Sequence, residues 1–228
     1  MKKLILLMLF ISLGAMATPR ESHVVYNIDS RSIINAKNHN EVHAIASLTK
    51  LMTAIIAIDS GNLDLELLSR LLIRSDNSAA DEIAKKHPGG RTEFIKAMNV
   101  RAAGMGLINT VYHDPSGLSV FNRSTAYEYI NVIIEAEKYT LIKQLSSTFE
   151  KTIITSRNKK YTMHNTNRLL QEYTNITLSK TGFTSMAGRC LALVIDGTST
   201  KHVIVILGEY SPETRAKLAR ELISLVTQ

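Results

Sequence analysis

A serine and a lysine three residues apart, Ser47 and Lys50, open an apolar helical pattern. The apolar residues that recur at helical spacing are Leu48, Leu51, Met52, Ile55 and Ile58. Residues three apart on a helix are neighbours, so the hydroxyl and the amine can share one small volume. A serine hydroxyl is a weak nucleophile until a base takes its proton. Lys50 can be that base only when neutral, which requires a pKa well below about 10.4.

Two further motifs carry side chains suited to proton transfer and anion binding. They are Ser75-x-Asn77 and Lys180-Thr181-Gly182. Each motif alone is weak evidence, because residues 156–159 satisfy both serine patterns and residues 60–62 satisfy the second. Both copies lie in the wrong context for a site: the first is in a polar stretch, and the second is at a predicted helix end. The lysine motif occurs once, at the end of a predicted strand, where glycine lets a ligand approach the backbone closely.

Taken together, the three motifs resemble those of the penicillin-recognising serine hydrolases, which include penicillin-binding proteins, D,D-peptidases and serine β-lactamases. Residues 46–53, 114–119 and 180–184 look like those of the low-molecular-mass D-alanyl-D-alanine peptidases. Residues 87–90 and 165–167 look most like the penicillin-binding protein 7 type of D,D-endopeptidase. The resemblance covers essentially all of the chain after residue 17 and implies a β-lactamase/transpeptidase-like fold.

The resemblance implies a role for each polar side chain of the first two motifs. Ser47 is the nucleophile and Lys50 the general base, with its pKa lowered by burial and by the positive charge of Lys180. Ser75 relays a proton to the departing amine. Asn77 holds either the substrate's peptide amide or the Lys50 ammonium. The expected cycle is acylation of Ser47, release of the amine and attack by water, without a metal or other cofactor.

The third motif and its neighbours are expected to bind the substrate. By resemblance, Lys180 and Thr181 bind the carboxylate of the D-amino acid beyond the scissile bond, next to Gly182. The backbone N–H group of Phe183 forms an oxyanion hole with that of the nucleophile. Thr184 completes the expected substrate-binding stretch.

The reactions of the superfamily are narrowed by what the chain contains. A class A β-lactamase needs a glutamate that activates the deacylating water, and no Glu-x-x-x-Asn sequence follows Asn77. Transpeptidases usually carry extra domains, and the carboxypeptidases a second β-rich domain and an amphipathic anchor. The chain ends at Gln228, directly after a predicted closing helix, which favours an endopeptidase. A D-alanyl-D-alanine carboxypeptidase and a catalytically silent wall-peptide or β-lactam binding protein remain as alternatives.

The order of the expected elements predicts an α+β fold, with an antiparallel sheet built from both termini and a helical region between. The predicted strands span residues 22–28, 32–36, 148–155, 176–179, 190–195 and 202–207, with another around Tyr161. Helices are expected from Ser47 to before Gly61, and over residues 79–86, 92–103, 125–138 and 212–226. Thr125 and Glu128 read as a capping box. Residues 104–122 are rich in glycine and polar residues and are expected to form a long surface loop.

The N-terminus reads as an export signal. Lys2 and Lys3 precede an apolar run over residues 4–13 and a small-x-small site at 15–17, so residues 1–17 are a predicted signal peptide and 18–228 a single peptidase domain. The run is short for a membrane span, which needs about 20 residues; an uncleaved anchor is the alternative. Export predicts a periplasmic protein with no stable membrane anchor.

Composition limits the partners further. The chain has one cysteine, Cys190, and therefore no disulfide within it, so its apolar core must stabilise the domain. The net charge of +7, or +5 without Lys2 and Lys3, favours an anionic surface such as a cell-wall polymer. The basic residues are scattered, which argues against nucleic acid, and the histidines show no metal-ligand spacing. The expected partners are peptidoglycan cross-links and β-lactams as covalent inhibitors.

Overall fold

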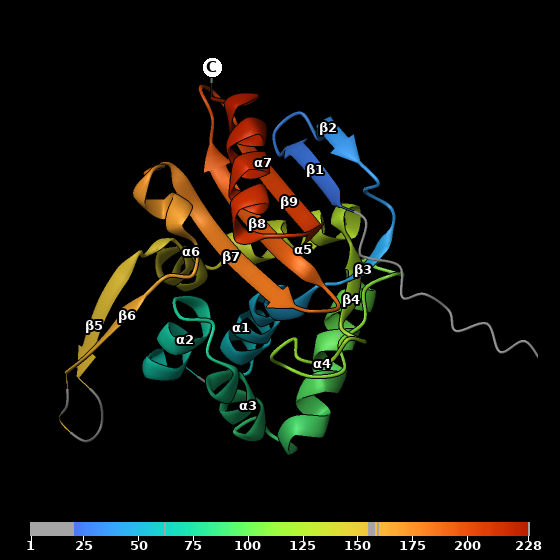
Figure 1. Cartoon of the computed structure of the whole chain (residues 1–228). Coiled ribbons are helices and arrows are strands. Elements are labelled where there is room, and N and C mark those ends of the chain that lie inside the picture. The colour runs from blue at the N-terminus through green and yellow to red at the C-terminus, as the bar shows by residue number, and fades with distance from the viewer. Residues whose placement is uncertain (1–20, 62, 155–157, 159, 228) are drawn as a thin grey trace, which may run out of the picture.

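The computed structural model describes residues 21–61, 63–154, 158 and 160–227. The predicted signal peptide therefore lies outside the described residues, as does most of the 156–159 stretch. The described chain forms a five-stranded sheet in the order β2-β1-β9-β8-β7, in which every neighbouring pair is antiparallel. Its strands are β1 (Ser22–Asn27), β2 (Ser32–Lys37), β7 (Ile176–Thr184), β8 (Gly188–Asp196) and β9 (Lys201–Glu209). The predicted α+β arrangement, with both chain ends in one sheet, is confirmed (Figure 1).

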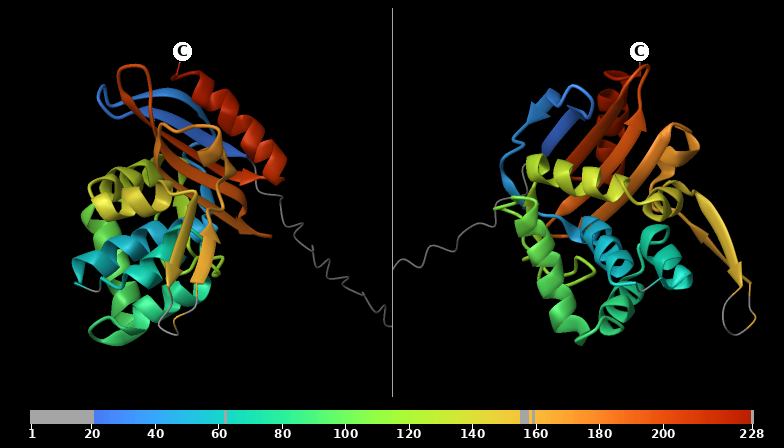
Figure 2. Two further views of the ribbon diagram at one scale, coloured as in Figure 1. Left: turned by 90° about the vertical axis from the view of Figure 1, so that its left-hand side faces the viewer. Right: turned by 180° about the vertical axis from the view of Figure 1, so that it is seen from behind.

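Helices cover both faces of this sheet. The closing helix α7 (Pro212–Ser224) lies on one face, and α5 (Ala126–Glu137) lies against the other together with the rest of the helical region (Figure 2). That region contains α1 (Lys50–Asp59), α2 (Leu65–Leu72), α3 (Asn77–Lys85), α4 (Gly90–Gly104) and α6 (Thr140–Ser147). The central strand β9 shows why the predicted strands read as continuous apolar runs. Val203 and Val205 enter the core on the helical side, whereas Ile204 and Ile206 enter the core beneath α7.

Two short two-stranded ribbons complete the described structure. β3 (Val42–Ala44) pairs with β4 (Arg123–Thr125), and β5 (Glu150–Ile154) pairs with β6 (Lys160–His164). The β5–β6 ribbon projects from the body of the molecule (Figure 1). Strands were therefore predicted correctly here, although the first begins at Glu150 instead of residue 148.

The structure differs from the local predictions at two helices and at one helix cap. Helices α2 and α6 were not predicted, and the segment of α6 reads as mainly polar, because only Leu141, Ile142 and Leu145 among its residues are apolar. The capping box is only half present. Thr125 Oγ1 accepts from Glu128 N at 3.0 Å, but the Glu128 carboxylate turns away and accepts from the backbone N–H of Asn109 instead.

The stretch from 104 to 122 is irregular as predicted, yet its middle is not on the surface. Asp114, Ser116 and Asn122 are buried. Their polar groups satisfy one another, as shown by Asn122 Nδ2, which donates to the carbonyl of Asp114 at 2.8 Å and to Thr49 Oγ1 at 3.0 Å. Composition predicts exposure for such residues, but a closed hydrogen-bond network removes the cost of burying them.

Candidate active site

Ser47 lies in a tight turn that precedes the helix carrying Lys50. The turn is the 3₁₀ segment η1 (Ala46–Thr49), and α1 begins at Lys50, so the prediction that Ser47 starts the α-helix is corrected by one turn. Ala46 enters it with φ +46°, a left-handed conformation that costs an alanine on the order of 1–2 kcal/mol. The sharp turn aims the serine across to the lysine. Lys50 Nζ donates to Ser47 Oγ at 2.8 Å.

Lys50 is held by the second motif and by the buried loop. It has no exposed surface, and its Nζ also donates to Asn77 Oδ1 at 2.7 Å and to the carbonyl of Ser116 at 2.5 Å. Burial lowers the pKa of Lys50 to about 7, although the carboxylates of Asp114 and Asp76 pull it upward. A large fraction of this amine is therefore neutral near neutral pH, as a general base requires.

The second and third motifs meet through one hydrogen bond. Lys180 Nζ donates to Ser75 Oγ at 2.8 Å and to the carbonyl of Thr181 at 2.9 Å. The pKa of Lys180 is well below its ordinary value because the side chain is fully buried and because Lys50 and Arg215 repel its charge. The repulsion between the two lysines was expected to lower the pKa of Lys50. Burial is the main cause of the lowered pKa of Lys50, and the repulsion between the two amines, which is mutual, disfavours the state in which both are charged.

Ser75 reaches the site from a strained connection between α2 and α3. Its φ is +63°, a left-handed conformation that is uncommon for serine. The following residue, Asp76, caps α3 by accepting from the backbone N–H groups of Ser78 at 2.8 Å and Ala79 at 3.2 Å. Asp76 also forms an ion pair with Arg70 at 2.9 Å. The cap and the ion pair hold the chain in the conformation that presents Ser75.

Strand β7 carries the third motif past Ser47. A Cβ added at Gly182 would lie 3.0 Å from Ser47 N and 3.0 Å from the carbonyl oxygen of Ile45, so only glycine fits without displacing the turn. The motif lies inside β7 and not at its end, because the strand continues to Thr184. Thr184 itself turns to the β7–β8 connection, where its Oγ1 accepts from Ala187 N at 3.1 Å. Its side chain does not line the cavity described below.

A second glycine fixes the turn from the opposite side. Gly117 has φ +87°, and a Cβ there would lie 1.9 Å from the carbonyl oxygen of Ala46. The Asp114 carboxylate shapes this loop by accepting from the backbone N–H of Gly117 at 2.7 Å and of Ser119 at 2.6 Å. The sequence pattern at 114–119 supported the family resemblance, but its role as a support for Ser47 and Lys50 was not predicted.

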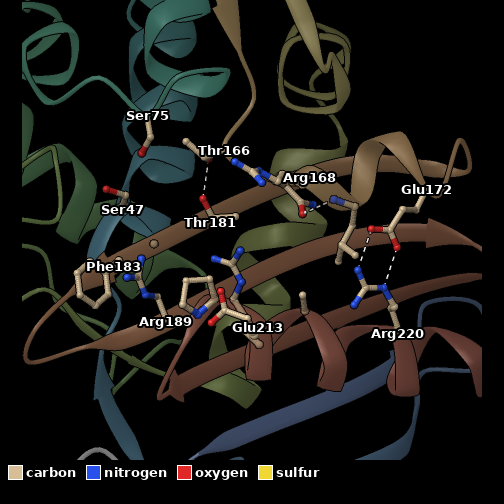
Figure 3. A pocket seen from close by; sticks show the side chains of 16 residues that line it. Ser47, Ser75, Thr166, Arg168, Glu172, Thr181, Phe183, Arg189, Glu213 and Arg220 are labelled. Carbon is tan, nitrogen blue, oxygen red and sulfur yellow. Dashed lines mark hydrogen bonds and ion pairs between the residues drawn. The ribbon is translucent and has the colours of Figure 1, made fainter.

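A cavity of about 830 Å³ opens at Ser47 and Ser75 and runs between β7, the 3₁₀ segment η2 (Arg168–Gln171) and α7. Figure 3 shows Thr181 in the middle of this cavity, with its Oγ1 2.6 Å from that of Thr166. The residues that line the cavity are Ser47, Ser75, Thr166, Asn167, Arg168, Leu169, Glu172, Thr181, Gly182, Phe183, Arg189, Pro212, Glu213, Arg215, Ala216 and Arg220. None of the four arginines was predicted from the sequence, because each comes from a segment without a motif.

Two of these arginines have partners near Gly182. The Arg189 guanidinium lies over the ring of Phe183, 3.5 Å from its centroid. Arg215 Nη1 donates to the carbonyl of Cys190 at 3.5 Å, and burial lowers its pKa. Arg215 comes from α7, which the sequence predicted as a closing helix and not as part of the site.

The described part of the chain adds two findings about the rest of the molecule. Within it, no group of three or more histidine, cysteine, aspartate or glutamate side chains is placed to hold a metal ion. No helix in the same residues is long and apolar enough to cross a membrane.

Comparison with known proteins shows the family to which the chain belongs. The sequence matches the family described as D-alanyl-D-alanine carboxypeptidase over residues 14–66 and 63–210. The chain belongs to this peptidase family. Among similar members, a D-alanyl-D-alanine endopeptidase from Pseudomonas aeruginosa is 35% identical over 206 residues, covering 75% of this chain and 66% of the relative. A D-alanyl-D-alanine carboxypeptidase from Bacillus subtilis is 29% identical over 233 residues, covering 88% and 60%. The matches thus span about two thirds or less of these relatives' own length.

The fold of this D-alanyl-D-alanine peptidase family member is shared with solved penicillin-binding proteins. A Listeria monocytogenes penicillin-binding protein, solved in an ampicillin-bound form, superposes with a TM-score of 0.79 at 24% sequence identity. The match covers 89% of this chain and 95% of that chain. The predicted β-lactamase/transpeptidase-like fold is confirmed.

Proposed function

We propose that this chain is an exported serine D,D-peptidase that hydrolyses D-alanyl cross-links of peptidoglycan through an acyl-enzyme on Ser47. The observation that carries the proposal is the contact between Ser47 Oγ and Lys50 Nζ at 2.8 Å, made by a lysine whose pKa burial lowers to about 7. A nucleophile beside a largely neutral amine is what acyl transfer from a peptide requires.

Acylation follows from the contacts in the site. The neutral Lys50 amine takes the Ser47 proton as the oxygen attacks the carbonyl carbon of the D-alanyl residue. The negative charge that develops on the carbonyl oxygen is stabilised by the N–H groups of Ser47 and Phe183, in the gap that Gly182 keeps open. The peptide C–N bond then breaks and the departing amine needs a proton.

Ser75 is placed to deliver that proton. Its Oγ accepts from Lys180 Nζ, so the serine can pass its own proton to the leaving amine and regain one from the lysine. Asn77 holds Lys50 from the other side, which keeps the amine aimed at Ser47 after it has become an ammonium. After acylation Lys50 is an ammonium and Lys180 lacks a proton, so a proton must first pass from Lys50 back to Lys180. The neutral Lys50 amine then takes a proton from the attacking water and returns it to Ser47 Oγ as the acyl–oxygen bond breaks and the D-alanyl acid leaves.

The carboxylate next to the scissile bond would bind in the middle of the cavity. Thr181 offers a hydroxyl there, and the cations of Lys180 and Arg215 lie close enough together to lower the pKa of Lys180. An incoming carboxylate would relieve this repulsion between like charges. Its binding therefore gains from two cations that form no ion pair with a carboxylate among the described residues, although the charge of Glu213 attracts Arg215.

Endopeptidase activity is favoured over carboxypeptidase activity within this family. The Pseudomonas relative named as an endopeptidase is 35% identical, against 29% for the Bacillus relative named as a carboxypeptidase. Carboxypeptidase activity is the second candidate, supported by the description of the family itself. Both reactions share the acyl-enzyme and differ in the leaving group. A carboxypeptidase releases the terminal D-alanine, and an endopeptidase releases the second peptide of the cross-link.

The proposal extends to inhibitors and to the compartment. A β-lactam presents an amide and a carboxylate to the same nucleophile and cation set, and the Listeria neighbour was solved with ampicillin bound. Peptidoglycan lies outside the cytoplasmic membrane, so the substrate agrees with the export signal predicted at residues 1–17 and with a periplasmic location.

Labelling with a fluorescent penicillin tests the nucleophile. The parent protein is expected to label covalently, and Ser47→Ala is expected not to. Ser60→Ala is the matched control, because Ser60 belongs to a copy of the second motif but donates to carbonyl groups of its own helix, those of Ile56 at 2.8 Å and Ala57 at 3.1 Å. Equal labelling of Ser47→Ala and the parent would refute the assignment, and absence of labelling in the parent would favour a silent binding protein.

Digestion of purified cross-linked muropeptides tests the reaction. Conversion of dimers to monomers establishes an endopeptidase. Loss of a terminal D-alanine without cleavage of dimers would establish the carboxypeptidase instead.

A further inference from the structure

The cavity continues well past the residues that acylation and carboxylate binding need. Ser47 and Ser75 lie at one end, Thr181 in the middle, and Glu172 and Arg220 at the other end (Figure 3). Its volume of about 830 Å³ falls in the range of sites that enclose molecules far larger than one alanine. A carboxypeptidase releases only a terminal D-alanine, and this residue would leave much of the cavity empty.

The far end is closed by an ion pair between its two walls. Arg220 Nε and Nη2 donate to the two carboxylate oxygens of Glu172 at 2.7 and 2.8 Å. Glu172 follows η2 and Arg220 belongs to α7, so the pair fixes the distance between the two walls. The charges of Glu172 and Arg220 neutralise each other. The net charge of this part of the cavity therefore depends on one further residue.

That residue is Arg168, the first residue of η2. Its side chain is exposed and, among the residues that the structure describes, it has no hydrogen-bond or ion-pair partner. Its guanidinium lies beside Thr166 at the wall of the cavity, between the catalytic end and the Glu172–Arg220 pair (Figure 3). The backbone beneath it is fixed, because Asn167 Oδ1 accepts from Leu169 N at 3.2 Å and caps η2.

The cavity as a whole is cationic. Its lining contains four arginines against two glutamates, an excess of two positive charges. Arg215 is assigned above to the carboxylate beside the scissile bond, and Arg189 is stacked on Phe183. Arg168 is therefore the cation left free to meet a second negative charge, farther along the path of the departing chain.

We propose that the far half of the cavity is a subsite for the leaving peptide of the cross-link, in which Arg168 binds a second carboxylate carried by that peptide. This inference rests on the proposed endopeptidase function. The leaving residue starts at Ser47 with its own carboxylate at Thr181, and the cavity offers the rest of its peptide a path toward Arg168. A guanidinium fits a carboxylate with two parallel hydrogen bonds, which gives both affinity and direction.

Three substrates separate this role from a structural one. The first is a cross-linked dimer whose leaving peptide carries a free second carboxylate. The second is the same dimer with that carboxylate amidated. The third is a short acyl-D-alanyl-D-alanine, from which only alanine departs. Each is measured with the parent, Arg168→Ala, Arg168→Lys and Lys217→Ala, a control that removes an exposed cation of α7 outside the cavity.

Arg168→Ala is expected to raise KM for the carboxylate dimer about 10-fold or more, with kcat nearly unchanged. The amidated dimer and the short substrate should change by less than about twofold, because neither offers the second carboxylate. Arg168→Lys should restore part of the affinity, since it keeps the charge but not the paired geometry. Lys217→Ala should match the parent throughout.

Two results would overturn the inference while leaving endopeptidase activity intact. One is an unchanged KM for the carboxylate dimer in Arg168→Ala, and the other is the same loss for all three substrates. If the parent labels with penicillin and removes alanine from the short substrate but hydrolyses neither dimer, the proposed endopeptidase function is wrong. The proposed subsite is then wrong as well. Penicillin labelling of every variant reports that the catalytic end is folded.

Discussion

Lys180 Nζ donates to Ser75 Oγ at 2.8 Å although the two residues are 105 positions apart in the chain. The lysine belongs to the sheet and the serine to the helical region, so this contact joins the sheet to the helical region. Burial and the charges of Lys50 and Arg215 lower the pKa of Lys180, which makes its proton easier to give up. The contact is therefore both a structural link and a route by which a proton can reach Ser75.

Ser75→Ala should remove that route without removing the nucleophile. We expect kcat on a peptide substrate to fall by about 10²–10⁴, the usual contribution of a positioned acid–base group. Labelling by penicillin should slow less, because the amine of a β-lactam remains tethered after the ring opens. Steady-state hydrolysis and the labelling rate measure the two effects.

Ser30→Ala is the control. Ser30 lies in the exposed β1–β2 turn, does not line the cavity, and its hydroxyl contacts that of Ser32. If Ser75→Ala hydrolyses peptide at the parent's rate, Ser75 is not on the proton path.

How much of the site the sequence predicts depends on whether the information is local. Ser47 and Lys50 are three residues apart, so helical periodicity alone predicts that their side chains are neighbours. Strands β8 and β9 were equally readable, because burial on both faces leaves continuous apolar runs. Family resemblance placed Ser75 and Lys180 in one site, but their hydrogen bond was not predicted, since no local rule joins residues in different layers.

The missed features all depend on tertiary contacts. The loop at 114–119 reads as exposed by composition, but its polar groups are paired with each other and with Lys50. The cavity arginines come from α7, η2 and the start of β8, elements that meet only in the folded chain. The left-handed turn at Ala46 is likewise invisible, because alanine gives no signal for a positive φ.

The pH dependence of acylation should follow the protonation of Lys50. Burial lowers the pKa of this amine from 10.5 to about 7, and only the neutral form can accept the Ser47 proton. Acylation by penicillin should therefore rise with pH up to about 7 and then level off. At two pH units below the pKa the neutral fraction, and with it the rate, is about 100-fold lower. Stopped-flow labelling across pH measures the profile.

Lys50→Met should abolish this profile along with the labelling. The variant also tests the pKa through stability. The unfolded chain keeps the Lys50 proton up to pH 10.5 while the folded chain releases it near 7, so the parent gains stability as pH rises between these values. Lys50→Met lacks this gain. Parallel pH–stability curves for the two proteins would be incompatible with a lowered pKa in the folded state.

Asp114→Asn should separate the loop's structural role from its effect on Lys50. Burial pushes the pKa of Asp114 upward, but hydrogen bonds from Ser116, Ser119 and Gly117 outweigh it and leave the pKa below 3.8. The carboxylate thus contributes stability that is present above pH 3.8 and is lost as the pH falls through the lowered folded pKa. We expect the variant to lose about 2 kcal/mol of unfolding free energy at pH 7. The difference should shrink in acid.

The same substitution should alter the acylation profile. Asp114 raises the pKa of Lys50 through its charge, so its neutralisation should lower that pKa further and move the rise in acylation rate to lower pH. Denaturant unfolding and stopped-flow labelling measure the two effects. A profile that stays in place, or moves to higher pH, would show that Asp114 does not act electrostatically on Lys50.

Gly117→Ala against Gly106→Ala tests whether the loop sets the position of the nucleophile. Both glycines have positive φ, +87° and +74°, so each substitution carries a similar backbone cost of about 1 kcal/mol. A Cβ at Gly106 meets no atom within 4 Å, whereas one at Gly117 would lie 1.9 Å from the carbonyl oxygen of Ala46 and 2.9 Å from Ser47 N.

Gly117→Ala must therefore displace the turn that carries Ser47. We expect acylation by penicillin to fall at least 10²-fold in Gly117→Ala, because a displacement on the order of 1 Å misaligns the nucleophile. Gly106→Ala should acylate like the parent and lose only the backbone cost in unfolding free energy. Labelling rates are compared well below the melting temperature of both variants, so that unfolding does not contribute. Equal acylation by the two variants would mean that the position of Ser47 does not depend on this contact.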